Sequence, residues 1–277
     1  MENNSKTLSF EFFPPKTEIG KRKLIELTHS LKRYSPEYFS VTFGAGGSTK
    51  EGTIDTCKSL IVDAQVDACA HISGIGSTKK DIKELLKIYQ TIGVTRLVVL
   101  RGDLPSGFGR IGDFPYALDL LNFIKAETDE YFRIEIAAYP EVHPEAINPK
   151  QDFENFVAKV NAGADGAITQ FFYQEEVYLD FINECAKKNI NIPIVPGIMP
   201  IHDLEANIRM ANGCGARIPK DLLNKLQIIE NNEDLIKFGI EIITQLCEKL
   251  YSYGAPSIHF YTINRLEPTK AVISALK

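Results

Sequence analysis

The chain has 277 residues, of which 44% are hydrophobic and 24% are charged, and its formal net charge is -5. The acidic balance argues against a nucleic-acid partner, and no stretch approaches the roughly 20 consecutive apolar residues that a membrane helix requires. Five scattered cysteines without a C-x-x-C pair are typical of reduced thiols in a cytoplasmic protein. We therefore expect a cytoplasmic globular protein with neither a membrane nor a nucleic-acid partner.

Short apolar runs alternate along the chain with longer segments in which apolar residues recur three and four positions apart. The runs predict strands at 8–12, 38–41, 68–72, 96–100, 133–138, 166–171, 194–198 and 258–261. The longer segments predict helices at 21–32, 52–63, 79–92, 115–128, 151–162, 175–188, 204–211, 219–229, 233–253 and 268–276. This pattern predicts an α/β fold, a single (β/α)8 TIM barrel domain over residues 1–277 with extra helices before the last strand. An open doubly wound sheet is the alternative, and the lack of a clear dinucleotide-binding turn disfavours it.

The first predicted strand carries a carboxylate among aromatic neighbours. Period-two alternation places Ser9 and Glu11 on one face of the strand and Phe10 and Phe12 on the other. Burial disfavours the charged form of a carboxyl group, so we expect a raised pKa for Glu11 and a role as general acid. The alternative is a structural glutamate held in a salt bridge.

Polar side chains also follow the other predicted strands, at the end of the barrel where active sites lie. His71 ends the third strand, where a lone histidine is more often a satisfied core residue than a catalyst. Arg101 and Asp103 follow a buried strand directly, which favours a binding role. His143 and Glu145 do not form H-E-x-x-H, and we expect no metal site. Gly197 in the seventh strand is expected to permit close approach of a ligand.

One glycine-rich segment imitates a nucleotide-binding motif. Residues 107–112 read GFGRIG and match G-x-G-x-x-G, but six residues separate them from the preceding strand. The motif binds a pyrophosphate only where it joins a strand directly to a helix. We therefore interpret the segment as a loop after the fourth strand.

The chain resembles the methylenetetrahydrofolate reductases in seven segments, which occur in order at the predicted strand ends: SFEFFPPK, SVTFGAGGS, LVVLRGDLP, AAYPEVHPE, AITQFFY, PGIMP and HFYTINR. The resemblance extends from Ser9 to about Leu266 and is nearest to the short bacterial form, without the regulatory C-terminal domain of the eukaryotic enzymes. It implies bound FAD, NADH or NADPH as hydride donor, and 5-methyltetrahydrofolate as product. It also implies a ping-pong order, in which the nicotinamide dinucleotide leaves before the folate binds.

The resemblance assigns roles to individual residues. Glu11 matches the family's acid, which promotes opening of the folate's five-membered ring, and Asp103 matches its carboxylate near the flavin and the pterin. Gln170 and Arg265 match positions that bind the folate substrate. The FAD-binding positions that carry over are Thr42, Phe43, Ala45, His71, Arg101, Gly102, Asp103, Tyr116, Ala117, Tyr139, His143, Asp152, Asn155 and Lys159.

The sequence departs from the family pattern at three positions. Phe43 replaces a frequent tyrosine, and Ala206 and Met210 stand where enteric relatives carry Gln and Phe. The departures at Ala206 and Met210 leave open the choice between NADH and NADPH. These two positions also support an alternative, a flavin-bearing barrel subunit that exchanges electrons with a partner protein. A pterin-binding transferase barrel without flavin is a third hypothesis. We expect a homo-oligomer.

Overall fold

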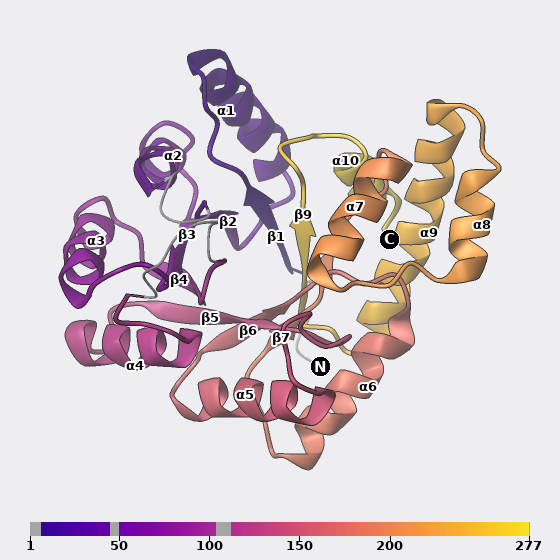
Figure 1. The fold of residues 1–277 in the computed structure, drawn as a ribbon. Coiled ribbons are helices and arrows are strands. Elements are labelled where there is room, and N and C mark those ends of the chain that lie inside the picture. Colours follow the sequence, from indigo (N-terminus) through magenta and orange to yellow (C-terminus); the bar gives the residue numbers. More distant parts are fainter. Residues whose placement is uncertain (1–6, 45–49, 104–111, 277) are drawn as a thin grey trace, which may run out of the picture.

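In the computed structural model, which describes residues 7–44, 50–103 and 112–276, parallel strands form a central ring and helices surround it (Figure 1). The strands are β1 (Thr7–Phe12), β2 (Tyr38–Val41), β3 (Ala68–Ser73), β4 (Arg96–Leu100), β5 (Arg133–Ala138), β6 (Gly166–Thr169), β7 (Ile194–Val195), β8 (Gly197–Ile198) and β9 (Ser257–Tyr261). Their order in the sheet is β7-β6-β5-β4-β3-β2-β1-β9-β8. The predicted barrel is confirmed.

The ring closes through a strand that the sequence predicts as continuous. The predicted strand 194–198 is split, because Pro196 separates β7, which pairs with β6, from β8, which pairs with β9. Proline has no backbone N–H to donate to a ladder, but its carbonyl accepts a hydrogen bond from His259 N at 3.0 Å. Strand β6 is also shorter than predicted and ends at Thr169.

Most helices lie where the sequence predicts them, and the extra pair before the last strand is confirmed. They are α1 (Glu18–Lys32), α2 (Lys50–Val62), α3 (Lys79–Thr91), α4 (Ala117–Thr128), α5 (Pro149–Asn161), α6 (Glu175–Lys187), α7 (Leu204–Cys214), α8 (Lys220–Gln227), α9 (Asn232–Ser252) and α10 (Thr269–Ala275). Helix α7 extends three residues beyond its predicted end and stops at Gly215, whose φ of 79° is the left-handed conformation that glycine adopts without strain.

Two apolar clusters follow from the alternation of side chains along the strands. The larger cluster fills the layer between the strands and the helices, where the Phe39 ring centroid lies 5.5 Å from that of Phe10 and 5.3 Å from that of Phe12. The smaller cluster contains Tyr38, Cys69, Val98 and Ile168, one residue from each of four strands. Side chains of opposite parity on a strand point to opposite faces, so the second cluster occupies the inside of the barrel.

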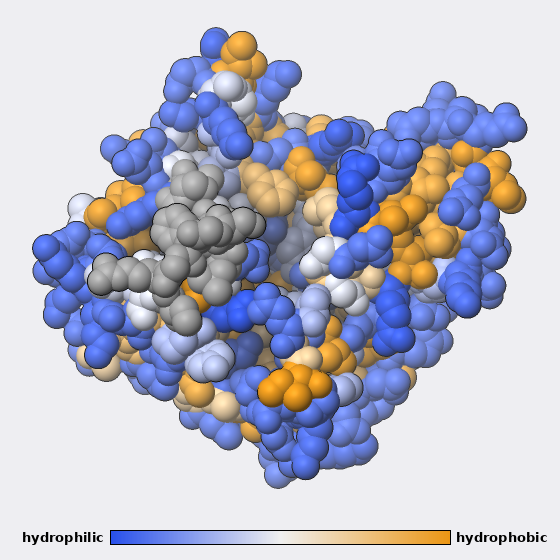
Figure 2. Space-filling view, viewed as in Figure 1, coloured by the Kyte–Doolittle hydropathy of each residue, from blue (hydrophilic) through white to orange (hydrophobic). Residues whose placement is uncertain are grey.

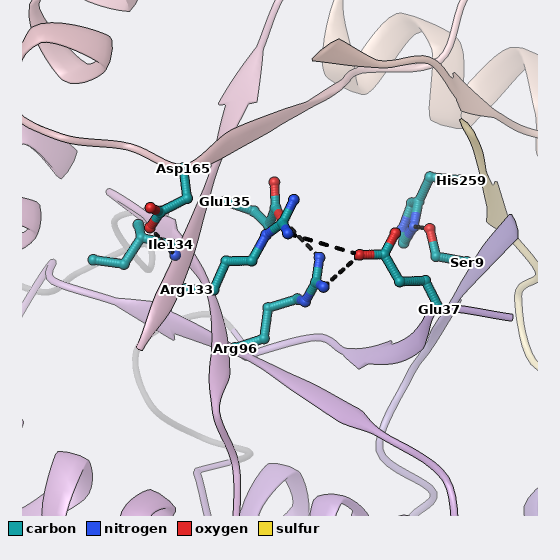
Figure 3. A network of polar contacts seen from close by, with 8 residues as sticks. All are labelled: Ser9, Glu37, Arg96, Arg133, Ile134, Glu135, Asp165 and His259. Carbon is teal, nitrogen blue, oxygen red and sulfur yellow. Dashed lines mark hydrogen bonds and ion pairs between the residues drawn. The ribbon is translucent and has the colours of Figure 1, made fainter. Parts of the chain in front are cut away.

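Below this interior cluster, an ion-pair network occupies the amino-terminal end of the barrel (Figure 3). Arg96 Nη1 lies 2.9 Å from Glu135 Oε1, and Arg96 also pairs with Glu37, while Arg133 Nε lies 3.3 Å from Glu135 Oε1. The Glu135 side chain is only 3% exposed. The Arg96 guanidinium also covers the Tyr38 ring at 4.3 Å. These contacts close the end of the barrel opposite the predicted site.

On the face shown in Figure 2, hydrophilic residues cover most of the surface, and hydrophobic residues gather over α7, α8 and α9. Among the described residues, none of the helices combines the length and the apolar character that spanning a membrane requires.

Candidate active site

The predicted acid lies beside two imidazoles inside the barrel. Glu11 Oε2 is 3.3 Å from His71 Nε2 on β3 and 3.8 Å from His259 Nε2 on β9. The Glu11 side chain is 12% exposed and that of His71 is 8% exposed, whereas His259 is fully buried. Neither Nε2 atom has a hydrogen bond of good geometry within the described residues. The three groups therefore form one buried acid–base cluster that has unused hydrogen-bonding capacity.

The electrostatic environment of Glu11 differs from the one expected from sequence. Burial alone would raise the pKa of this carboxyl group, but the attraction of His71 and polar contacts with both imidazoles outweigh burial and lower the pKa to about 2. The expectation of a raised pKa is therefore wrong for the protein without ligands, because it considered the aromatic neighbours and not the histidines. Burial also lowers the pKa of His259, against the opposing effect of Glu11.

His259 was not among the residues predicted for the site. The register of β1 against β9 aligns Ser9 with His259 and Glu11 with Tyr261, so His259 shares the inward face that the alternation gave to Ser9 and Glu11. The alternation of side chains in the segment SIHFY could have identified His259 as inward-facing, if the first strand had been assumed to pair with the last. His71 also differs from the expectation of a satisfied core residue, because its Nε2 lies 3.3 Å from Glu11 Oε2 in the acid–base cluster.

A cavity of about 250 Å³ opens at the carboxyl ends of the strands, and Glu11 and Gln170 both line it. Gln170 follows β6, and its side-chain oxygen accepts a hydrogen bond from Phe171 N at 3.0 Å, which leaves the amide NH2 group available to a ligand. The other lining residues are mostly apolar: Phe13, Phe171, Met199, Met210, Gly213, Cys214, Tyr261 and Ile263. The structure thus brings together a carboxyl group and an amide on one apolar cavity, as ligand sites typically do.

The residues predicted after β4 lie at the same end of the barrel. Arg101 is half-buried and pairs with Glu145, and its Nε also donates to Gly102 O at 3.2 Å. Gly102 has a φ of 84°, and a Cβ atom there would lie 1.9 Å from Ser73 Oγ, so glycine is required. Asp103 is exposed and does not line the cavity.

The loop after β5 and helix α5 hold a second group of predicted residues together. The Tyr139 and His143 rings meet edge to face at 4.5 Å, and His143 N donates to Asp152 Oδ2 at 2.8 Å. Burial lowers the pKa of Lys159 to about 8, and its Nζ donates to Ala137 O at 2.8 Å. Asn155 lies on the exposed part of α5.

The remaining predicted residues are more dispersed. Thr42 and Phe43 directly follow β2, Tyr116 caps α4 with its side chain 66% exposed, and Ala117 begins that helix. Arg265 is exposed in the segment after β9 and does not line the cavity. Ala45 and nearly all of the GFGRIG segment lie outside the described residues.

The role expected for Gly197 is wrong. A Cβ atom at this position would lie 2.2 Å from Thr169 O and 2.5 Å from Tyr261 Cε2. The space beside Gly197 is therefore filled by the neighbouring strands, and Tyr261 OH donates to the same Thr169 carbonyl at 2.8 Å. The glycine permits close packing of the barrel itself, which in turn positions the Tyr261 ring at the cavity.

A parallel barrel with a buried carboxylate, two imidazoles and an apolar cavity at its carboxyl end defines the class of barrel proteins that carry an acid–base site. The family model described as methylenetetrahydrofolate reductase matches residues 1–277. The chain belongs to the methylenetetrahydrofolate reductase family.

Relatives in plants and bacteria agree with this membership. Methylenetetrahydrofolate reductase (NADH) 1 of Arabidopsis thaliana is 37% identical over 277 residues, which cover 95% of this chain and 47% of the plant protein. The 5,10-methylenetetrahydrofolate reductase of Salmonella typhimurium is 35% identical over 270 residues, 97% of this chain and 90% of the bacterial protein. The chain spans about half the length of the plant relatives that it matches.

Among solved structures, the chain resembles an uncharacterized protein from Clostridium thermocellum that binds two copies of 5-methyl-5,6,7,8-tetrahydrofolic acid. The TM-score is 0.67, the sequence identity is 17%, and the match covers 99% of this chain and 94% of that one. At this identity the likeness shows a common fold.

Proposed function

We propose that this protein reduces 5,10-methylenetetrahydrofolate to 5-methyltetrahydrofolate, with FAD as its cofactor and NADH or NADPH as hydride donor in a ping-pong reaction. The observation that carries the proposal is the Glu11 carboxyl group, buried between two imidazoles at a cavity that it shares with Gln170. Membership of the reductase family and the likeness to relatives named as reductases support the same activity. An exchange of electrons with a partner protein is not favoured, because the plant relatives are named for NADH.

The polar groups beside the cavity suit a dinucleotide cofactor such as FAD. The Lys159 amine donates to a backbone carbonyl, and burial lowers its pKa against the opposing effect of the Asp152 charge. An anionic ligand would offset the cost of burying this cation. Arg101 and His143 lie at the same end of the barrel, and cationic and N–H donors match the oxygens of a diphosphate. A flavin held by these residues would supply the hydride chemistry that links the nicotinamide to the folate's methylene group.

In this proposal the chain's own residues handle the proton. Glu11 is the member of the acid–base cluster that lines the cavity, whereas His259 is completely buried behind it. A substrate that displaces water from the cavity desolvates Glu11 further and raises its pKa, which favours uptake of a proton by the carboxylate. Glu11 then donates this proton to the folate. The Gln170 amide holds the pterin in place.

Anaerobic reduction tests the proposal. The purified protein is mixed with NADH and with NADPH separately, and absorbance of a bound flavin near 450 nm (approximate) is followed. We expect bleaching by at least one of the two dinucleotides and recovery of the absorbance when methylenetetrahydrofolate is added. A protein that binds no flavin, or whose reduced flavin is not reoxidised by the folate, would contradict the proposal.

A further inference from the structure

Helix α7 forms one wall of the cavity and is held firmly at its amino-terminal end. Buried Asn207 accepts hydrogen bonds from His202 N and Asp203 N at 3.3 and 3.4 Å. Its Nδ2 donates to Tyr173 OH at 3.1 Å and to Pro200 O at 3.3 Å. These four contacts join the first turns of α7 to the segments that follow β6 and β8.

The rotation of α7 about its axis is set by the same contacts. Met210 and Cys214 follow Asn207 by three and seven residues, so all three side chains lie on one face of the helix. Met210, Gly213 and Cys214 line the cavity that contains Glu11 and Gln170. A change in the tilt of α7 would therefore change the shape of the cavity.

The carboxyl-terminal end of α7 is fastened to a different part of the protein, the loop after β5. Glu141 Oε2 accepts a hydrogen bond from Arg217 N at 2.9 Å, and Glu141 Oε1 lies 3.2 Å from Arg217 Nε. The Glu141 side chain is 9% exposed, whereas that of Arg217 is 78% exposed, so the carboxylate is the buried member of the pair. Pro144 packs against Gly215, the residue that ends α7.

The loop that receives this end of α7 also carries residues that the proposed function assigns to the cofactor. Tyr139 and His143 stand on either side of Glu141, and the Arg101 guanidinium pairs with Glu145 of the same loop. Val142, between Glu141 and His143, has a φ of 80°. A β-branched residue adopts this conformation only where surrounding contacts hold it there.

We propose that Glu141 is a positioning residue that couples the cofactor site to the substrate cavity through α7. This inference rests on the proposed function, since it takes FAD and a folate as the two ligands. Cofactor bound against Tyr139 and His143 fixes the loop, the contacts of Glu141 with Arg217 transmit that constraint to the end of α7, and Met210 and Cys214 keep their places in the cavity wall. Thermodynamic linkage makes the effect reciprocal, so a folate in the cavity also slows the loss of FAD.

The test measures FAD release after dilution, from the fluorescence of the freed flavin, with and without saturating 5-methyltetrahydrofolate. In the wild-type protein we expect the folate to slow release about tenfold, within the usual range for coupled sites. Glu141→Ala should reduce this factor to about twofold or less, and Glu141→Gln, which removes only the charge, should give an intermediate factor. Glu205→Ala is the matched control, because Glu205 and Arg209 form an exposed ion pair on the same helix.

A second readout reports on α7 directly. Hydrogen exchange of residues 204–214 should slow when FAD binds the wild-type and Glu205→Ala proteins, and should not slow in Glu141→Ala. Equal coupling factors in the wild-type and Glu141→Ala proteins, or an equal loss in Glu205→Ala, would overturn the inference. A wild-type protein that takes up no FAD would overturn the proposed function and this inference with it. If the protein binds FAD but the factor by which folate slows FAD release does not depend on Glu141, only this inference is overturned.

Discussion

The Ser9 hydroxyl lies 2.7 Å from His259 Nδ1, although 250 residues separate them in the chain. The contact exists because β1 pairs with β9 and places both residues in register inside the barrel. It orients the imidazole so that Nε2 faces the Glu11 carboxylate at 3.8 Å. The first and last strands therefore build the acid–base cluster jointly, and the charge state of Glu11 depends on closure of the ring.

Glu11→Gln should separate the two halves of the proposed reaction. The amide keeps the size of the side chain but can neither accept nor deliver the proton, so reduction of the folate should fall by about 100-fold or more. Flavin content and bleaching by the nicotinamide dinucleotide should stay within about twofold of wild type, since hydride transfer to the flavin needs no proton from Glu11. Stopped-flow absorbance measures the two half-reactions separately.

The bleaching rate of the same variant is the internal control. If folate turnover in Glu11→Gln stayed within tenfold of wild type, Glu11 would contribute at most about 1.4 kcal/mol to the barrier, too little for the proposed acid. If bleaching and folate reduction fell equally, the substitution would have damaged the flavin site in general.

The lowered pKa of Glu11 predicts a pH dependence of stability. The folded-state pKa of about 2 lies below the usual value of 4.5 for a glutamate, so the ionised group contributes stability above pH 4.5 and loses it as the pH falls towards 2. The full contribution is about 3 kcal/mol. The difference in unfolding free energy between the wild type and Glu11→Gln should therefore shrink by about this amount between pH 5 and pH 2. Urea titrations across this range would measure it, and a constant difference would contradict the lowered pKa.

The Asp103 carboxylate should influence the proposed flavin electrostatically. Burial raises the pKa of Tyr139 to about 12 and the Asp103 charge adds to this effect, so the field of Asp103 reaches the loop after β5. A negative charge near a flavin disfavours its anionic reduced form, so Asp103→Asn should raise the flavin midpoint potential by tens of millivolts, as an order of magnitude. A dye-equilibrated redox titration measures the potential. Asp55→Asn, an exposed change on α2, should leave it unaltered.

The sequence predicted the features that depend on local pattern. Strand alternation and the polar residues at strand ends gave the barrel, the inward position of Glu11 and the place of Gln170 at the cavity. The sign of the Glu11 pKa shift could not follow from local pattern, because His71 and His259 reach Glu11 through pairing between strands distant in the chain. The break in the strand at Pro196 was not predicted, because the residues on both sides of it are strongly apolar.

The part of α7 that lines the cavity also could not be predicted from local sequence pattern. The helix itself was predicted, but which of its faces meets the cavity depends on Asn207 and on the contact between Arg217 and Glu141, whose partners lie 34 and 76 residues away. Met210 was singled out from the resemblance alone, and its place in the cavity lining is a finding of the structure.

Gly197→Ala should destabilise the barrel, because the added Cβ would meet Thr169 O at 2.2 Å and the Tyr261 ring at 2.5 Å. Overpacking of this kind costs about 1–3 kcal/mol. Gly213→Ala is the contrasting control: it lies within α7 with no atom within 4 Å of an added Cβ, and removing a helical glycine should add up to about 1 kcal/mol. Urea unfolding at neutral pH measures the free energy of unfolding of both variants. Equal values for Gly197→Ala and Gly213→Ala would argue against the close packing at β8.

The ion pairs at the amino-terminal end of the barrel should behave as a unit. Arg96→Met removes the 2.9 Å contact of Glu135, whose side chain is 3% exposed, and leaves it paired only with the more exposed Arg133. Uncompensated burial of a charge predicts a loss of about 3–5 kcal/mol in unfolding free energy.

Replacing the partner as well should reverse much of that loss. In the double variant Arg96→Met with Glu135→Met, no buried carboxylate remains without its main partner, and apolar side chains of similar volume can fill the space. The double variant should therefore be more stable than Arg96→Met alone, with a coupling free energy of about 1–3 kcal/mol from the double-mutant cycle. Additive losses in the two single variants would mean that each charge acts independently and that the network does not stabilise this end of the barrel.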